Sequence, residues 1–289
     1  MLKSVDHLFD TVFSEKSQKI FEKYILLLAT CGFIIHLILI YLNKYGYISF
    51  DFNNTLLLDP ISALYTPFSF ILVYEAYLLI YYLPNSFTVT VVKEYEIISL
   101  ILIRKIFKDF PLINLDVPFF SEASNIQLLY DLSGIVIVFF LIYLFKTTAG
   151  KPKTIKPDAR LNKFIRQKKL ISLILVPTLL TLAGWSFYLW FNSAVLGIGA
   201  AQDINYLFFV DFFTILILVD VFILLISFRY TERYSQLIRN TGFIISTILL
   251  RLSFAATGLV SVVLIASGVL FGLIILAIFK RMEKFKYLG

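Results

Sequence analysis

The amino-acid sequence predicts an all-α, polytopic integral membrane protein with about eight transmembrane helices, arranged as two parallel four-helix repeats. Three observations lead to this prediction. The chain has 289 residues, of which 59% are hydrophobic and only 16% are charged, whereas soluble domains carry about 25% charged residues. Its apolar runs are continuous and reach about 20 residues, the length that a helix needs to cross the hydrocarbon core of a bilayer. Two stretches half a chain apart also resemble each other.

The internal resemblance is centred on residues 72–109, where an apolar segment carries Glu75, turns, and returns as a second segment with Arg104. A looser copy lies in the second half of the chain. The segment EIISLILIR aligns with FIISTILLR, so that Arg104 falls on Arg251 at an offset of 147 residues, and Asp220 occupies the place of Glu75. Because each half contains an even number of spans, the two halves should point the same way through the membrane.

Hydropathy divides the chain into four regions. We expect an amphipathic surface helix over residues 1–23, because its apolar residues recur at helical spacing. A first membrane module follows at 24–146, then a basic linker at 147–169, and a second module at 170–289. The expected spans are 24–43, 61–83, 88–107, 125–145, 170–190, 205–228, 241–257 and 259–279.

Lysine and arginine are concentrated in the linker, in the loop after the sixth span and in the C-terminal tail. With eight spans all of these segments fall on one side, which the positive-inside rule makes cytoplasmic. We therefore expect a multi-pass protein of the cell membrane with both termini in the cytoplasm. The linker residues expected to bind anionic lipid headgroups are Lys163, Arg166, Lys168 and Lys169. Membrane lipids are the expected partners, with other membrane proteins or a second copy as further possibilities, and no nucleic acid.

Ionisable residues inside the expected spans are the candidate functional residues, because a charge at the bilayer centre costs about 2.5–3.5 kcal/mol and usually has a partner. They are His36, Glu75, Arg104, Asp131, Asp211, Asp220 and Arg251, with Glu94, Glu96 and Lys105 as further candidates. These charges either fix the register of neighbouring helices or line a water-filled path for an ion. We expect His36 to hydrogen-bond a neighbouring helix, which is commoner than a proton relay.

Counting residues outward from the connecting loops gives each charge a depth in the membrane. Arg104 is level with Asp131, and Asp211 is level with Arg251, so these two pairs are the expected ion pairs. A contact between Glu75 and Arg104 would have to bridge about ten residues of helix rise, roughly 15 Å.

Several kinds of chemistry lack their sequence signature. The chain has no HExxH, GxSxG, P-loop or GxGxxG motif and no cluster with metal-ligand spacing. Two histidines and one cysteine, Cys31, make a metal site, a haem site or an internal disulfide unexpected, and we expect no cofactor. Gly268 and Gly272 form a GxxxG motif, which is typical of close helix contact.

The first module resembles the PsiE family of four-helix membrane proteins, which is named for induction by phosphate starvation. The resemblance spans roughly 24–146 and depends on Tyr74-Glu75, Arg104, Asp109 and a final span that ends in basic residues. The second half keeps Asp220 and Arg251 but has Ala256 where the family's aspartate would be. The resemblance implies a four-helix fold for each module and brings no activity with it.

Three functional hypotheses follow. The doubled module with internal charges favours a channel or permease for ions or small solutes. The absence of large loops and of recognisable chemistry is equally typical of a non-catalytic membrane subunit or sensor that binds other membrane proteins. An intramembrane enzyme acting on lipids would need Glu75, His36 and Asp131 to converge on a cavity.

Overall fold

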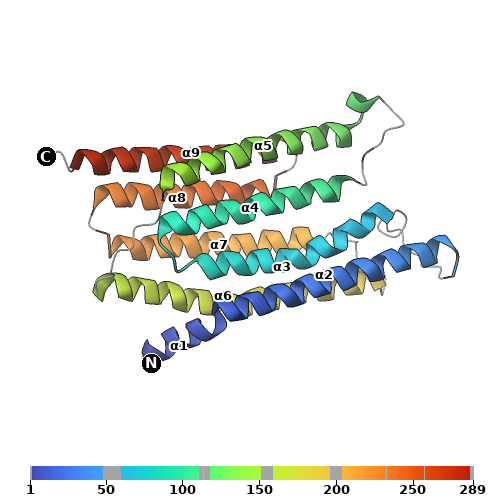
Figure 1. Cartoon of the computed structure of the whole chain (residues 1–289), viewed down its shortest axis with the longest axis horizontal. Coiled ribbons are helices and arrows are strands. Elements are labelled where there is room, and N and C mark those ends of the chain that lie inside the picture. Colours follow the sequence, from blue (N-terminus) through green and yellow to red (C-terminus); the bar gives the residue numbers. More distant parts are fainter. Residues whose placement is uncertain are drawn as a thin grey trace.

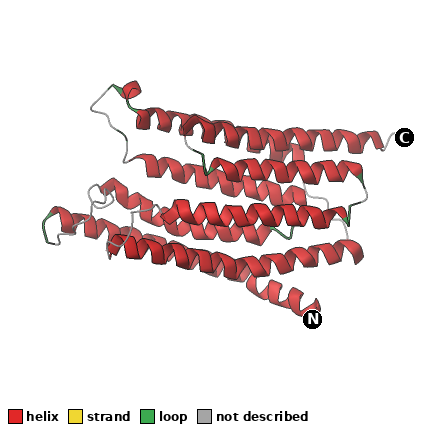
Figure 2. Ribbon diagram, turned by 180° about the vertical axis from the view of Figure 1, so that it is seen from behind, coloured by secondary structure: helices red, strands yellow, loops and turns green. Residues whose placement is uncertain are grey.

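The protein is a bundle of long helices (Figure 1). A computed structural model describes residues 2–47, 60–110, 113, 118–150, 159–195, 204–231, 233–256 and 258–286. The α-helices are α1 (Leu2–Val12), α2 (Glu15–Lys44), α3 (Tyr65–Tyr82), α4 (Phe87–Asp109), α5 (Ala123–Ala149), α6 (Ala159–Val195), α7 (Ile204–Phe228), α8 (Tyr234–Ser253) and α9 (Gly258–Lys286). The described residues also include the short 3-10 helices η2 (Pro60–Leu64) and η4 (Phe119–Ser121). The described residues contain helices and loops and no strand (Figure 2).

Each of the eight expected spans lies on a single helix, from α2 to α9, apart from a few residues at the ends. Six of these helices are long and apolar enough to cross a membrane, which identifies an integral membrane protein. These six helices are α2, α3, α5, α6, α7 and α9. The other two, α4 and α8, are less apolar because they carry many of the charged and polar side chains.

The two less apolar helices lie inside the bundle. Helix α4 packs against α3, α5 and α8, and helix α8 packs against α4, α7 and α9. Nine of the twenty residues of α8 are buried, including Asn240 and Arg251. Neighbouring helices therefore shield the polar groups of α4 and α8 from lipid. Ionisable groups in membrane proteins are tolerated in such an interior position.

Hydrogen bonds at the helix ends explain several element boundaries. Ser14 caps α2 by accepting a hydrogen bond from the Ser17 amide at 3.0 Å, and Ser86 caps α4 in the same way at 3.4 Å. Gly150 ends α5 with φ of 68°, a left-handed conformation that favours glycine. The turn between the end of α3 at Tyr82 and the start of α4 at Phe87 is short, so these two helices are antiparallel neighbours.

Two regions expected to lie outside the bundle belong partly to it. The expected surface helix over residues 1–23 is divided at Phe13 and Ser14, and α2 begins well before the first expected span. Phe13 is buried, with its ring 5.8 Å from that of Tyr77, and this anchors α1 to α3. Residues 159–169, the second part of the expected linker, form the first turns of α6. They are helical because their apolar face, including the buried Phe164, packs into the protein.

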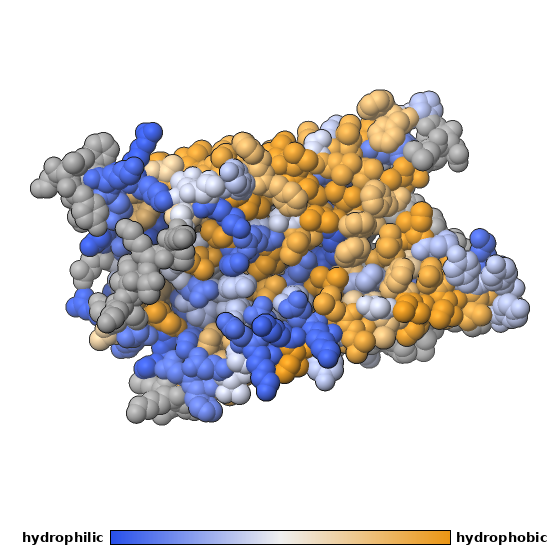
Figure 3. All heavy atoms as spheres, viewed as in Figure 1, coloured by the Kyte–Doolittle hydropathy of each residue, from blue (hydrophilic) through white to orange (hydrophobic). Residues whose placement is uncertain are grey.

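Both ends of the chain lie at the same end of the bundle, on the left in Figure 1. We call this the basic end. It contains the α3–α4 turn, the start of α6, the α7–α8 turn and the last turns of α9. Hydrophilic residues are gathered most densely at this end, whereas apolar side chains cover most of the remaining visible surface (Figure 3). This distribution agrees with a lipid-embedded bundle that has a charged surface at one end.

A polar contact joins α4, α8 and α9 in the interior. The hydroxyl groups of Tyr95 and Ser246 are 2.5 Å apart, and the Ser246 hydroxyl donates to the carbonyl of Gly268 at 2.6 Å. A Cβ atom on Gly272 would collide with the Tyr95 hydroxyl. The close helix contact predicted from the GxxxG motif is thus confirmed, because both glycines face side chains of neighbouring helices.

Candidate functional site: a buried cluster of ion pairs

Five helices form a closed circuit of packed neighbours, in the order α3, α4, α8, α7 and α6, with α6 returning to α3. Six of the seven charged side chains that are buried among the described residues belong to these helices. They are Glu75 on α3, Glu94 and Arg104 on α4, Lys168 on α6, Asp220 on α7 and Arg251 on α8. Three are acidic and three are basic, so the formal charge of the set is zero.

Arg251 joins two carboxylates from different helices. Its Nη1 donates to Asp220 Oδ2 at 2.5 Å, and its Nη2 donates to Glu94 Oε1 at 3.1 Å. The planar guanidinium group suits such a bridge, because its donors point in fixed directions. The Thr247 hydroxyl also donates to Asp220 Oδ2, at 3.4 Å. Arg251 therefore ties α7 and α8 of the second half to α4 of the first half.

Lys168 supplies the second positive charge near these two carboxylates. It is 2% exposed, and its Nζ donates to the carbonyl of Asn85 at 2.6 Å. The Nζ atom lies 5.1 Å and 5.7 Å from the ring centroids of Phe87 and Phe164, within the range of cation–π contacts. Lys168 also interacts electrostatically with Asp220 and Glu94. It thus belongs to the same cluster as Arg251 and lies next to the α3–α4 turn, at the basic end.

Glu75 and Arg104 form the corresponding pair in the first half. Arg104 Nη1 lies 3.0 Å from Glu75 Oε2 and donates to the carbonyl of Phe68 at 3.1 Å. The expected Arg104–Asp131 pair is therefore wrong. The depth count failed because helical side chains lean toward the N-terminus of their own helix. In the antiparallel α3–α4 pair, Glu75 leans away from the turn and Arg104 leans toward it, so their ends meet.

The expected Asp211–Arg251 pair is also wrong, since Arg251 is bound to Asp220 and Glu94. Asp211 is exposed on α7, and it forms no ion pair within the part of the chain that the structure describes. In both halves the arginine of the third helix instead contacts the acid of the second: Arg104 contacts Glu75, and Arg251 contacts Asp220. The two contacts are therefore alike, although the acids are 145 residues apart and the arginines 147.

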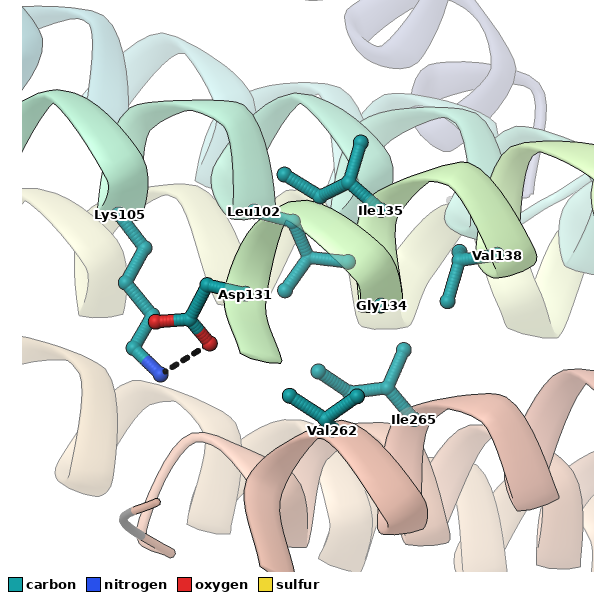
Figure 4. A pocket seen from close by; sticks show the side chains of 8 residues that line it. All are labelled: Leu102, Lys105, Asp131, Gly134, Ile135, Val138, Val262 and Ile265. Atoms are coloured by element: carbon teal, nitrogen blue, oxygen red, sulfur yellow. Dashed lines mark hydrogen bonds and ion pairs between the residues drawn. The ribbon is translucent and has the colours of Figure 1, made fainter. Parts of the chain in front are cut away.

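Asp131 lies outside the five-helix circuit and has its own partners on α4 and α5. Its Oδ1 is 3.1 Å from Lys105 Nζ, and its Oδ2 accepts from Gln127 Nε2 at 2.8 Å. Figure 4 shows this pair at one side of a cavity of about 10 Å³. Aliphatic side chains of α4, α5 and α9 line the rest, and a volume of this size holds about one water molecule.

His36 contacts the neighbouring helix as expected, with Nδ1 2.5 Å from the hydroxyl of Thr66 on α3. Glu75, His36 and Asp131 consequently have separate partners: Arg104, Thr66, and the side chains of Lys105 and Gln127. Among the described residues these three side chains contact separate partners and not one another, whereas a lipid-modifying enzyme would need them to converge.

The four residues expected to bind headgroups have different environments. Lys163 is exposed and Lys168 is buried. Arg166 Nε lies 2.9 Å from Asp6 of α1, and Lys169 Nζ lies 3.4 Å from Asp6 and 3.1 Å from Asp10. Helix α1 therefore covers part of the basic surface of α6.

Lys168 and Glu94 are the members of the cluster whose roles the sequence analysis missed. The basic neighbours of Lys168 in the sequence predict a headgroup-binding role for it. A usable signal was the spacing of the residues on the inner face of α6: Phe164, Lys168, Ser172, Leu175 and Leu179, all of which are buried. Glu94 was a candidate, but no local pattern links it to Arg251, which is 157 residues away.

The fold and the cluster together define an integral membrane protein with a helical bundle and buried ion pairs. Comparisons with protein-family models, with characterised proteins and with solved structures found no match to this chain.

Proposed function

We propose that this protein is a channel or permease for ions or small solutes, built from two PsiE-like four-helix modules that together cross the membrane eight times. Hydropathy supports six crossings directly. Helices α4 and α8 complete the set because they pack lengthwise between those helices. The lysine and arginine at the basic end favour a cytoplasmic position for that end and for both termini.

The neighbour relations of the helices support two modules. The contacts α2–α3, α3–α4 and α4–α5 in the first half correspond to α6–α7, α7–α8 and α8–α9 in the second. The halves meet through α4 with α8 and through α5 with α9, which are equivalent helices, and also through α3 with α6, which are not. An axis along the membrane normal would relate two such parallel modules.

The observation that carries the transport proposal is the set of six buried charges, which consists of Glu94, Lys168, Asp220 and Arg251 in one group and the separate pair of Glu75 and Arg104. Replacing buried ion pairs by well-packed apolar residues is often neutral or stabilising, so packing alone gives little reason to keep them. Intramembrane ionisable residues also mark ion or proton pathways. Glu94 Oε2 and Arg251 Nε are also buried without a hydrogen-bond partner among the described residues. Glu94 and Arg251 thus each have one hydrogen-bonding atom that the observed contacts do not use.

In this proposal Glu94 and Asp220 are the carboxylates that a permeating cation or proton would use. Arg251 and Lys168 neutralise them in the conformation observed. Passage then requires the ion pairs to exchange partners, with Lys168 nearest to the basic end. In this proposal the observed conformation is a closed state, since Arg251 contacts both carboxylates directly.

Direct pairing also favours the second candidate, a non-catalytic membrane subunit in which the same ion pairs only hold the helices in register. The two functions differ in whether the isolated protein conducts. A subunit would conduct nothing by itself and would be recovered with a specific membrane-protein partner.

Reconstituted liposomes distinguish the two. We expect the purified protein to increase the flux of protons, potassium or chloride above that of empty vesicles, and D220N and E94Q to reduce that flux at least tenfold. D211N is a matched control, because Asp211 is an exposed carboxylate on the same helix as Asp220. Absence of flux for all three ions would remove the proposal. If D211N and D220N reduced the flux equally, the flux would not depend on the buried charges.

A further inference from the structure

Four of the buried charges form one site inside the bundle, which we call the four-charge site. They are Glu94 on α4, Lys168 on α6, Asp220 on α7 and Arg251 on α8, and each is at most 3% exposed. Glu94 interacts electrostatically with the other three, and Lys168 interacts with both acids. Two acids and two bases make the site formally neutral.

A lysine distinguishes the four-charge site from the pair of Glu75 and Arg104. That pair consists of one acid and one arginine, and the position that aligns with Glu94 at the offset of 147 residues is the uncharged Thr241. A guanidinium group keeps its proton under physiological conditions, whereas an ammonium group can give it up. Among the six buried charges of the five-helix circuit, Lys168 is therefore the base that can exchange a proton.

One carboxylate oxygen in the site is placed to accept a proton. Glu94 Oε1 and Asp220 Oδ2 accept hydrogen bonds from Arg251, whereas Glu94 Oε2 is buried without a hydrogen-bond partner among the described residues. An unpaired polar atom in such a setting is costly, and the cost is larger when the group is charged. Protonation of Glu94 at Oε2 lowers this cost because it removes the negative charge, and Arg251 then still balances Asp220.

The hydrogen bond of Lys168 is available to its charged and its neutral form. Its Nζ donates to the carbonyl of Asn85 at 2.6 Å and lies against the rings of Phe87 and Phe164. None of these partners carries a formal charge, and a neutral amine also donates to a carbonyl. Asn85 is exposed in the α3–α4 turn, so this hydrogen bond holds Lys168 close to the surface of the basic end.

The same groups suit other small ions poorly. A potassium ion needs several oxygens to replace its hydration shell, and in the four-charge site it would lie beside two positive side chains. A chloride ion would lie beside two carboxylates. A proton needs a single lone pair, and the site stays neutral when Lys168 loses one proton as Glu94 gains one.

We propose that the ion transported by this protein is a proton, exchanged between Lys168 Nζ and Glu94 Oε2. One N–H bond breaks and one O–H bond forms, and the two side chains both become neutral. Lys168 turns from the Asn85 carbonyl toward Glu94 for this step, and water at the basic end returns a proton to its amine. The inference rests on the proposed transport function and names its substrate.

Parallel flux measurements on the full-length protein in liposomes test the substrate. We expect proton flux at least tenfold above that of empty vesicles, with potassium and chloride fluxes at the level of empty vesicles. K168R keeps the positive charge and can stack on the same two aromatic rings, but it cannot release a proton. It should therefore lower the proton flux at least tenfold, as should E94Q. K284R makes the same exchange at an exposed position on α9 and should conduct like wild type.

Infrared difference spectroscopy in detergent gives a reading that needs no transport. Lowering the pH should produce the carbonyl stretch of a protonated carboxyl group that E94Q lacks. E96Q is the matched control, because Glu96 lies on the same helix with a side chain that is 29% exposed and paired with two lysines. This variant should keep the band.

Each outcome decides a different part of the inference. Potassium or chloride flux as large as the proton flux would overturn the choice of proton and leave a channel or permease in place. Absence of flux for all three ions would remove the transport proposal itself and the inference with it. Wild-type proton flux in K168R would exclude Lys168 as the exchanging base, and an unchanged carbonyl band in E94Q would exclude Glu94 as the acceptor. If K168R fails to fold, the ion selectivity of the wild type and the spectrum of E94Q still decide.

Discussion

Arg251 on α8 and Glu94 on α4 are joined by a hydrogen bond of 3.1 Å between Nη2 and Oε1, although 157 residues separate them in the chain. Both side chains are almost completely buried. The contact therefore connects the two halves of the protein through charge in the interior as well as through apolar packing.

The first prediction concerns this contact. R251M leaves the carboxylates of Glu94 and Asp220 without the guanidinium that both contact. Breaking a buried pair in this way costs about 3–5 kcal/mol. We expect a loss of that size in the free energy of unfolding in detergent micelles. R281M changes an exposed arginine near the end of α9 and should stay close to wild type. Similar stabilities for the two variants would show that the cluster contributes nothing to folding.

The second prediction concerns Glu75 and Arg104. Because each neutralises the other in a buried setting, E75Q and R104M should each destabilise the protein, and the double variant should lose less than the sum. A double-mutant cycle should give a coupling energy of about 1–3 kcal/mol. E75Q combined with D211N is the control, and these two effects should add within about 0.5 kcal/mol. Additive behaviour of E75Q and R104M would contradict the observed contact.

The third prediction tests the close approach of α4 and α9. G272A places a methyl group against the Tyr95 hydroxyl and should destabilise the bundle by about 1–3 kcal/mol. Y95F in the same chain should recover part of the loss by removing that hydroxyl. Gly184 has open space around it, so G184A should be neutral or slightly stabilising in a helix. Thermal unfolding measures all three, and a harmless G272A would rule out the packing described.

The fourth prediction concerns α1. Asp6 and Asp10 form the ion pairs that hold it on α6, and partly exposed pairs are worth about 0.2–1 kcal/mol each. D6N/D10N should therefore accelerate hydrogen exchange in α1 by about 5–30-fold, and high salt should do the same to the wild type. Phe13 keeps some attachment in both cases. E15Q alters a nearby exposed acid as the control, and unchanged exchange in D6N/D10N would exclude the electrostatic anchor.

The fifth prediction concerns orientation. In a C31S background, single cysteines at positions 19, 163 and 284 should react with a membrane-impermeant thiol reagent from the cytoplasmic side. Tyr47 lies just past the other end of α2 and is exposed, so Y47C should react from the opposite side. Labelling of K163C and K284C from different sides would contradict the eight crossings.

Much of the fold follows from the sequence, whereas the partners of the buried charges do not. Apolar runs of membrane length locate the helices because lipid cannot form hydrogen bonds with free backbone groups. Each continuous run must therefore be helical. The candidate charges were recognisable for a similar reason, since a charge in lipid is costly wherever its partner lies. Partners depend on the lean and reach of side chains, which made Glu75 and Arg104 meet despite their unequal depths.

Lys168 shows the limit of reading local composition. Five of the eleven residues from 159 to 169 are basic, which predicts a surface that binds lipid headgroups. The helix that they form has a buried side, and Lys168 lies on it together with Phe164 and Ser172. Composition describes a segment as a whole, whereas a helix places neighbouring residues on different faces, some buried and some exposed.

The placement of α4 and α8 has a consequence for biogenesis. If α4 and α8 cross the membrane as proposed, neither helix is apolar enough to be released into the bilayer alone at low cost. Helix α4 needs the carboxylate of α3 beside its arginine, so these two should leave the translocon as a hairpin. Helix α8 needs Glu94 of the first half as well as Asp220. The order of synthesis supplies this, because the first half is already in the membrane when the ribosome reaches α8.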